Sequence, residues 1–194
     1  MIQAAESVRG TARVCGILAN PVEHSMSPML QNLYAESTGT DLVYVPFKVK
    51  EEELQAAVSG AFALNILGMN VTVPHKQEVM KYLDDVDEEA REVGAVNTLV
   101  RTERGYKGYN TDVEGLRRAV EEAGFAVNGR DCLLIGAGGA ARAAVCMMVR
   151  GKAGSITVLN RSLEKAEELA EYGNRMAGRD LMKALPLSQW KELP

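Results

Sequence analysis

The sequence has few cysteines and no run of basic residues. Its three cysteines, Cys15, Cys132 and Cys146, lack C-x-x-C spacing, and their odd number argues against a closed disulfide framework. We interpret them as small buried hydrophobic residues. No run of five or six Lys or Arg occurs, so neither nucleic acid nor an anionic membrane surface is an expected partner.

Segments that would direct the chain to a membrane are also lacking. No stretch approaches the roughly 20 apolar residues that cross a bilayer, and the N-terminus has no basic segment followed by an apolar run. We therefore expect a cytoplasmic protein. Of the 194 residues, 46% are hydrophobic and 25% are charged, with a net charge of -4. This composition suffices for a sizeable core and favours a small-molecule partner.

The first part of the chain alternates apolar or β-branched segments with helical ones. Strands are expected at 14–18, 42–49, 69–73, 95–101 and 106–109. Helices are expected at 28–36, 51–60, 76–83 and 113–123, with another starting in the acidic cluster at 84–89. Ser27 is expected to cap the first helix, with Pro28 at its first position. A metal site in the acidic cluster is the alternative, set aside because no spaced His accompanies it. The pattern predicts an α/β domain over residues 1–124.

Residues 125–194 show a βαβα pattern with short connections, which is typical of the first half of a doubly wound sheet. Strands are expected at 132–135, 155–159 and 181–187, and helices at 140–149 and 162–176. There the pattern stops. We therefore expect an incomplete Rossmann-like dinucleotide-binding domain.

A glycine-rich loop joins the first strand of this pattern to its first helix. Residues 136–141 read GAGGAA and match G-x-G-x-x-G/A. The first glycine permits a tight turn, and the second lets a pyrophosphate approach the backbone at a helix N-terminus. A simple glycine turn is the alternative, but the βαβ setting favours dinucleotide binding.

The end of the next strand carries basic residues instead of an acid. Asn160 and Arg161 stand where an NAD-preferring site usually has Asp or Glu. Ser162 is a good N-cap, yet Lys165 occupies the helical position where a capping box prefers Glu. Since local rules are often broken for function, we infer that Arg161 and Lys165 bind the 2′-phosphate of NADP. Solvated surface charges, offset by nearby glutamates, are the alternative.

Four further segments place polar side chains at expected strand ends or in the loops that follow. They read SMSP at 25–28, NVTVPHK at 70–76, GAVNT at 94–98 and NTD at 110–112. Each alone has an ordinary explanation as a turn, a cap or a surface residue. In this order, ahead of the glycine motif, they make the chain resemble the shikimate dehydrogenase family from about residue 14 to 193.

The resemblance implies a substrate domain and an NADP domain. It also implies NADPH-dependent reduction of 3-dehydroshikimate to shikimate, in the pathway to chorismate and the aromatic amino acids. Its catalytic pair would be Lys76 and Asp112, because a lysine can stabilise charge on a carbonyl oxygen and donate a proton. The substrate-binding positions it implies are Ser25, Ser27, Asn70, Thr72, Lys76, Asn97 and Asp112. The cofactor-binding positions it implies are Gly136, Ala137, Gly138, Gly139, Ala140, Asn160, Arg161, Ser162 and Lys165. We interpret His24 and His75 as structural.

The family pattern continues past residue 194 with the rest of the dinucleotide sheet and a C-terminal helix. We therefore expect a chain truncated at its C-terminus, and an incomplete sheet would expose apolar surface and promote association of copies. Two alternatives stay open. One is a fragment that binds substrate without turnover. The other is a quinate/shikimate dehydrogenase that favours NAD, against which Asn160 and Arg161 argue.

Overall fold

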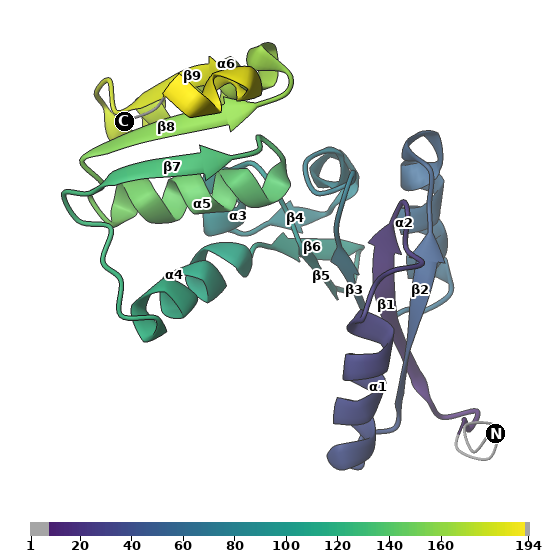
Figure 1. The fold of residues 1–194 in the computed structure, drawn as a ribbon. Helices are drawn as coiled ribbons and strands as arrows, with labels where there is room; N and C mark the ends of the chain where they lie inside the picture. Colours follow the sequence, from purple (N-terminus) through teal and green to yellow (C-terminus); the bar gives the residue numbers. More distant parts are fainter. Residues whose placement is uncertain (1–7, 193–194) are drawn as a thin grey trace. The chain divides into compact units, whose positions relative to one another are not determined.

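The structure is a computed structural model that describes residues 8–192, and it divides after Asn110 into two compact units. Both units alternate strands and helices (Figure 1), as the sequence predicts for an α/β protein. The first unit ends with Asn110 and the second begins with Thr111. Each is described by itself.

The first unit is built on a six-stranded mixed sheet in the order β2-β1-β3-β5-β6-β4. Strand β1 pairs in parallel with β2 and β3, whereas β5 is antiparallel to both β3 and β6. Pro46 is tolerated within β2 because that strand lies at the sheet edge. The strands are β1 (Arg13–Ala19), β2 (Leu42–Lys48), β3 (Gly68–Val71), β4 (Asp85–Val86), β5 (Thr98–Arg101) and β6 (Tyr106–Tyr109).

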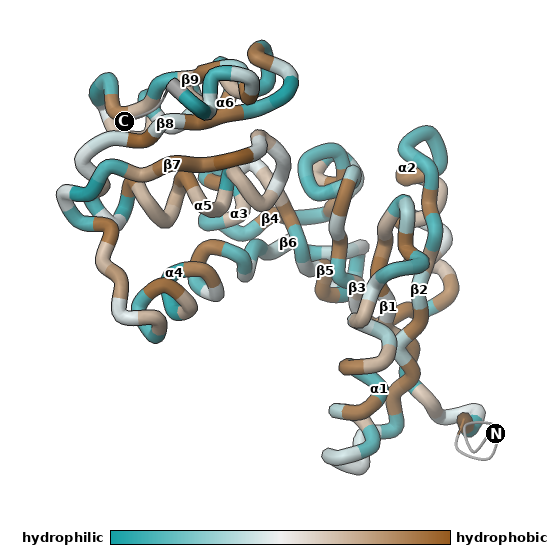
Figure 2. Tube along the Cα trace, viewed as in Figure 1, coloured by the Kyte–Doolittle hydropathy of each residue, from teal (hydrophilic) through white to brown (hydrophobic). Residues whose placement is uncertain are grey.

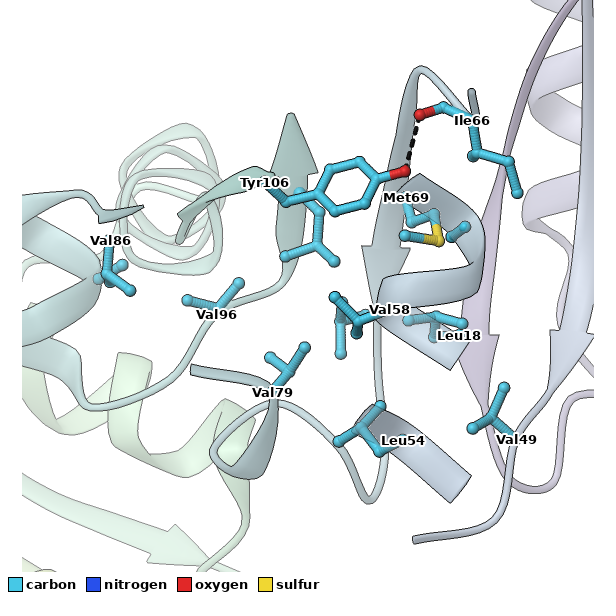
Figure 3. Close-up of a cluster of buried hydrophobic side chains, with 14 residues drawn as sticks. Leu18, Val49, Leu54, Val58, Ile66, Met69, Val79, Val86, Val96 and Tyr106 are labelled. Carbon is cyan, nitrogen blue, oxygen red and sulfur yellow. Dashed lines mark hydrogen bonds between the residues drawn. The ribbon is translucent and has the colours of Figure 1, made fainter. Parts of the chain in front are cut away.

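Short helices complete this unit and bury its main core. They are α1 (Ser27–Ser37), η2 (Glu51–Glu53), α2 (Leu54–Ala63), η3 (Glu78–Tyr82) and α3 (Glu88–Val93). Figure 3 shows the buried cluster that joins α2 and η3 to the sheet, with Leu54 and Val79 fully buried. Tyr106 is buried there too, and its hydroxyl donates to the Ile66 carbonyl at 2.7 Å. This bond satisfies the one polar atom that the ring brings into the core.

The α-helix predicted at 76–83 is wrong, whereas the helix expected to start in the acidic cluster at 84–89 is confirmed as α3. The segment 76–83 forms turns and the short η3, because the Lys76 carbonyl accepts from Val96 N at 2.7 Å instead of from a helical partner. The acidic cluster does not begin a helix at once. Residues 85–86 pair with β6 as β4, and Asp87 then caps α3 by accepting from Glu89 N. The helix therefore starts in the second half of the acidic cluster, directly after the strand.

The cap of α1 also differs from the prediction. Met26 is the N-cap, with helical backbone angles, and Ser27 is the first helical residue. The helix therefore begins one residue earlier than expected, and no side chain caps it. Pro28 lies in the first turn, where its missing N–H costs nothing.

The second unit contains a three-stranded parallel sheet in the order β7-β8-β9. Its strands are β7 (Asp131–Ile135), β8 (Ser155–Asn160) and β9 (Met182–Pro186). Its helices are α4 (Asp112–Glu122), α5 (Gly139–Arg150), α6 (Leu163–Ala177) and the short η4 (Leu187–Glu192). The expected βαβα pattern and its final strand are confirmed. The compact unit begins ahead of α4, whereas the sequence assigned that helix to the first domain; α4 packs against α5.

Strand β7 lies at one edge of this sheet and leaves apolar side chains uncovered. Figure 2 shows the hydrophobic character of β7 and β8. Within β7, Leu133 is 52% exposed and Ile135 is 66% exposed. An exposed apolar strand edge favours association. Association between copies stays a prediction.

The cysteine prediction is confirmed at one position and wrong at two. Cys146 is buried in α5, whereas Cys15 and Cys132 are partly exposed. Cys132 lies on the edge strand β7, where one side of the sheet has no neighbouring strand. Partial burial nevertheless raises the pKa of both thiols.

Membrane-spanning helices and metal-binding clusters are both absent from residues 8–192. Among these residues, no helix has the length and apolar character needed to cross a bilayer. In the same part of the chain, no group of three or more His, Cys, Asp or Glu is placed to hold a metal ion.

Candidate functional site

Polar residues of the first unit gather at one end of the neighbouring strands β3, β5 and β6. Asn70 of β3 pairs with Thr98 of β5, and Thr98 pairs with Tyr109 of β6. Thr72 and Asn97 adjoin these pairs, and Asn97 N donates to the Tyr109 carbonyl at 2.9 Å. The register therefore brings together residues from two of the polar segments found in the sequence.

A network of side-chain hydrogen bonds orients the amides of Asn70 and Asn97 at this end of the strands. The Tyr44 hydroxyl donates to Asn70 Oδ1 at 2.7 Å, and Asn70 Nδ2 lies 3.5 Å from the Asn97 carbonyl. Thr98 Oγ1 donates to Asn97 Oδ1 at 2.8 Å. Burial raises the pKa of Tyr44 to about 12, so its hydroxyl stays a donor at neutral pH. The two amides are thus held in defined orientations.

Tyr44 was not among the residues predicted from the sequence. It lies in the middle of β2, where a strand pattern indicates only packing. Its ring is buried against Ile17 and Ala19. Asn32 of α1 fixes the same strand, since its side chain accepts from Tyr44 N and donates to the Tyr44 carbonyl, both at 2.9 Å. Only the pairing of β1 with both β2 and β3 reveals that Tyr44 reaches Asn70.

Lys76 lies in the turn after β3, half-buried, with its backbone tied to other segments. Its carbonyl accepts from Val96 N. The preceding His75 is fully buried, with its Nε2 2.8 Å from the Val49 carbonyl. In residues 8–192, His75 Nδ1 has no hydrogen-bond partner. The histidine joins the turn to the end of β2 and limits the positions that the Lys76 backbone can take.

Ser25 and Ser27 lie at the N-terminus of α1. Ser27 N donates to Ser25 Oγ at 3.3 Å, so the two residues are neighbours. The first turn of this 11-residue helix contains no acidic residue. Unpaired N–H groups and the helix dipole favour an anion at such a terminus. The serines could therefore contribute hydroxyl groups to a carboxylate.

The NTD segment runs across the division between the two units. Asn110 closes the first unit, is 5% exposed, and donates from Nδ2 to the Ala95 carbonyl at 2.8 Å. Asp112 begins α4 in the second unit and is half-buried. The helix N-cap is Thr111, so Asp112 does not act as the cap.

The glycine loop has the conformation that its sequence predicts. It runs from β7 into α5, and Gly136 has a φ of 107°, which side chains other than that of glycine rarely allow. A Cβ atom on Gly136 or Gly138 would meet no atom within 4 Å. The space in front of the 12-residue α5 is thus open, and the helix offers N–H groups to an anion. These residues fit a pyrophosphate.

Basic residues follow the next strand, β8. Ser162 caps α6 as predicted, accepting from Lys165 N at 3.4 Å, and Asn160 Nδ2 donates to the Ser162 carbonyl at 3.0 Å. Arg161 and Lys165 are exposed, and neither forms an ion pair within residues 8–192. Neither cation is paired directly with a glutamate in this part of the chain, so both can bind a phosphate.

Comparisons with known proteins match both halves of the chain. Residues 17–99 match the family model for the shikimate dehydrogenase substrate binding domain. Residues 118–192 match the model for shikimate/quinate 5-dehydrogenase. A shikimate dehydrogenase (NADP(+)) of Geobacter metallireducens is 46% identical over 93% of this chain and 63% of its own length.

Solved structures agree with the family models. A shikimate dehydrogenase in complex with NADP+ is 41% identical, with a TM-score of 0.81 over 89% of this chain and 59% of its own. A shikimate 5-dehydrogenase of Listeria monocytogenes in complex with shikimate and NAD is 33% identical, with a TM-score of 0.81 over 95% of this chain and 65% of its own. The chain spans between 55 and 66% of the length of the curated relatives that it matches.

Proposed function

This chain belongs to the shikimate dehydrogenase family, and we propose that its protein reduces the ring ketone of 3-dehydroshikimate to shikimate with NADPH. The observation that supports this proposal is the pair of oriented amides, Asn70 and Asn97, beside the ends of β3 and β5. The hydrogen bond from Tyr44 fixes the Asn70 amide, which is suited to bind a ring hydroxyl. The product would enter the pathway to chorismate and the aromatic amino acids.

We assign the proton chemistry to Lys76 and Asp112. Reduction of a ketone places negative charge on its oxygen, which a lysine ammonium can stabilise and then neutralise by donating a proton. Asp112 would hold the ammonium in position and accept a hydrogen bond from the adjacent hydroxyl. The backbone ties around Lys76 support this assignment, because a group that donates a proton must be positioned before it reacts.

The remaining substrate contacts follow from the types of side chain present. Ser25 and Ser27, at the N-terminus of α1, would bind the substrate carboxylate. The ring hydroxyls would be bound by Asn70, Thr72 and Asn97, because amides and hydroxyls both donate and accept hydrogen bonds. The residues proposed to bind the carboxylate and those proposed to bind the ring hydroxyls therefore belong to different elements.

The second unit would hold the cofactor, and NADPH supplies a hydride when it is bound. The open glycine loop would receive the pyrophosphate, and the cations after β8 would receive the 2′-phosphate. The proposed cofactor-binding residues are Gly136, Ala137, Gly138, Gly139, Ala140, Asn160, Arg161, Ser162 and Lys165. A cytoplasmic location and the association of copies stay predictions.

The proposal is tested on the 194-residue chain itself. We expect calorimetry to detect shikimate binding and absorbance to detect NADPH oxidation with 3-dehydroshikimate. Parallel assays follow the oxidation of NADH with 3-dehydroshikimate and the reduction of NAD+ with quinate. Shikimate binding without turnover would favour the substrate-binding fragment, whereas faster turnover with quinate and NAD would favour the quinate/shikimate alternative. No binding of either acid would contradict the proposed function.

Replacement of Tyr44 by phenylalanine should weaken shikimate binding by roughly two- to tenfold, because the variant loses one hydrogen bond of ordinary strength. The ring would keep its packing against Ile17 and Ala19, so the melting temperature should change little. Calorimetry measures the affinity. The matched control is Tyr34→Phe, which removes a hydroxyl from an exposed tyrosine of α1. Equal affinities for Tyr44→Phe and the unaltered chain would exclude a role for Tyr44 in orienting Asn70.

A further inference from the structure

A cavity that is shallow and open to solvent lies at the C-terminal ends of β8 and β9, beside Arg161. Its volume is about 420 Å³, and it is lined by Arg161, Pro186, Leu187, Ser188 and Trp190. Small-molecule sites commonly measure about 300 to 1,000 Å³. The cavity is therefore large enough for part of a ligand whose phosphate reaches Arg161.

The strand register brings the walls of this cavity together. Asn160 of β8 pairs with Pro186 of β9, so the chain leaves the two parallel strands at neighbouring points. Arg161 follows the first of these residues and Leu187 follows the second. Leu187 begins η4, and side chains three residues apart eclipse one another in a 3-10 helix. Trp190 therefore shares a face of η4 with Leu187, and both line the cavity.

The chemistry of the walls suits a flat aromatic base. Trp190 is 58% exposed, and Lys191 Nζ lies over its ring, 5.4 Å from the centroid, so the indole offers surface for stacking beside a second cation. Arg161 has a planar guanidinium that can bind a phosphate or stack on an aromatic ring, and it has no ion-pair partner among residues 8–192. Pro186 and Leu187 add apolar surface, and the Ser188 hydroxyl can hydrogen-bond to the edge of a base. An adenine that carries a phosphorylated ribose combines these features.

We propose that Trp190 is a cofactor-binding residue on which the adenine base of NADP stacks. This inference rests on the proposed function, because it assumes that the phosphate at Arg161 belongs to NADP. It adds a residue from η4 to a site otherwise predicted from the glycine loop and the end of β8. Stacking of a base on an aromatic side chain contributes enough to change affinity roughly five- to a hundredfold.

Intrinsic fluorescence tests the inference directly, because Trp190 is the only tryptophan of the chain. Adenosine 2′,5′-bisphosphate is the probe, since it contains both adenine and the 2′-phosphate. We expect saturable quenching of Trp190 emission by this probe and none by ribose 5-phosphate, which has no base. By calorimetry, Trp190→Ala should bind the probe about tenfold more weakly. Trp190→Phe should stay close to the unaltered chain, because its ring can still stack.

Two controls separate folding and phosphate binding from stacking. Phe125→Ala removes an exposed aromatic side chain of the same unit outside the cavity, and it should leave probe affinity unchanged. Circular dichroism checks that each variant is folded. One outcome would contradict only the inference on Trp190: Arg161→Ala weakens probe binding, whereas Trp190→Ala leaves it unchanged and the probe does not quench Trp190 emission. The proposed NADP site would then stand. If the unaltered chain does not bind the probe, both the inference on Trp190 and the proposed NADP site are wrong.

Discussion

Replacement of Lys76 by alanine should lower the turnover of 3-dehydroshikimate by about two to four orders of magnitude, which is the usual contribution of a positioned general acid. Shikimate affinity should fall much less, because the serines and amides proposed to bind the carboxylate and ring hydroxyls remain in place. Turnover is measured by NADPH oxidation and affinity by calorimetry. The expected signature is a large loss in kcat with a modest change in shikimate binding.

The matched control is Lys81→Ala. Lys81 lies five residues further along, in η3, and forms an exposed ion pair with Glu78 at 2.8 Å. Such pairs contribute little to stability, so turnover should be unaffected. A Lys76→Ala variant that keeps near-normal turnover would exclude Lys76 as the proton donor. Equal losses in kcat and in shikimate affinity would indicate a general binding role instead.

Replacement of Arg161 by alanine should weaken NADPH binding by about tenfold and leave NADH binding unchanged. A hydrogen bond to a charged group is worth about 1.5 to 3 kcal/mol, and the exposure of Arg161 places the expected effect at the lower end. The two cofactors differ only by the 2′-phosphate, so the ratio of their affinities reports on this contact alone. Calorimetric titration with each cofactor measures it.

Arg175→Ala serves as the control for Arg161. Arg175 is an exposed arginine of α6 whose nearest carboxylate oxygen, on Glu171, is 3.8 Å away. Its removal changes the net charge of the chain by the same amount, so any general electrostatic effect on an anionic cofactor would appear in both variants. Equal weakening of NADPH and NADH by Arg161→Ala would show that the 2′-phosphate site is assigned to the wrong residue.

Local sequence predicted the regular elements well where the signal came from neighbouring residues. The βαβα pattern, the hairpin strands β5 and β6, and the Ser162 cap are all confirmed. These features depend on periodicity, turn residues and hydrogen bonds a few residues apart. The glycine loop belongs to the same class, because the positive φ of Gly136 is a local requirement that only glycine meets easily.

Two departures from the predicted elements involve partners distant in the sequence. A helix at 76–83 is prevented by the bond from Val96 N to the Lys76 carbonyl, and residues 85–86 form a strand because β6 is available to pair with them. Propensity within a short window contains no information about such partners.

The sequence by itself determined the family resemblance, the order of most helices and strands, and the chemical types of side chain proposed for the site. Those properties are encoded in motifs whose residues are adjacent along the chain. Only the tertiary structure decided that Tyr44 of β2 orients Asn70 of β3, and that Trp190 of η4 shares a cavity with Arg161 after β8. Both relations come from strand register, which joins residues more than 25 positions apart through hydrogen bonds that no local pattern records.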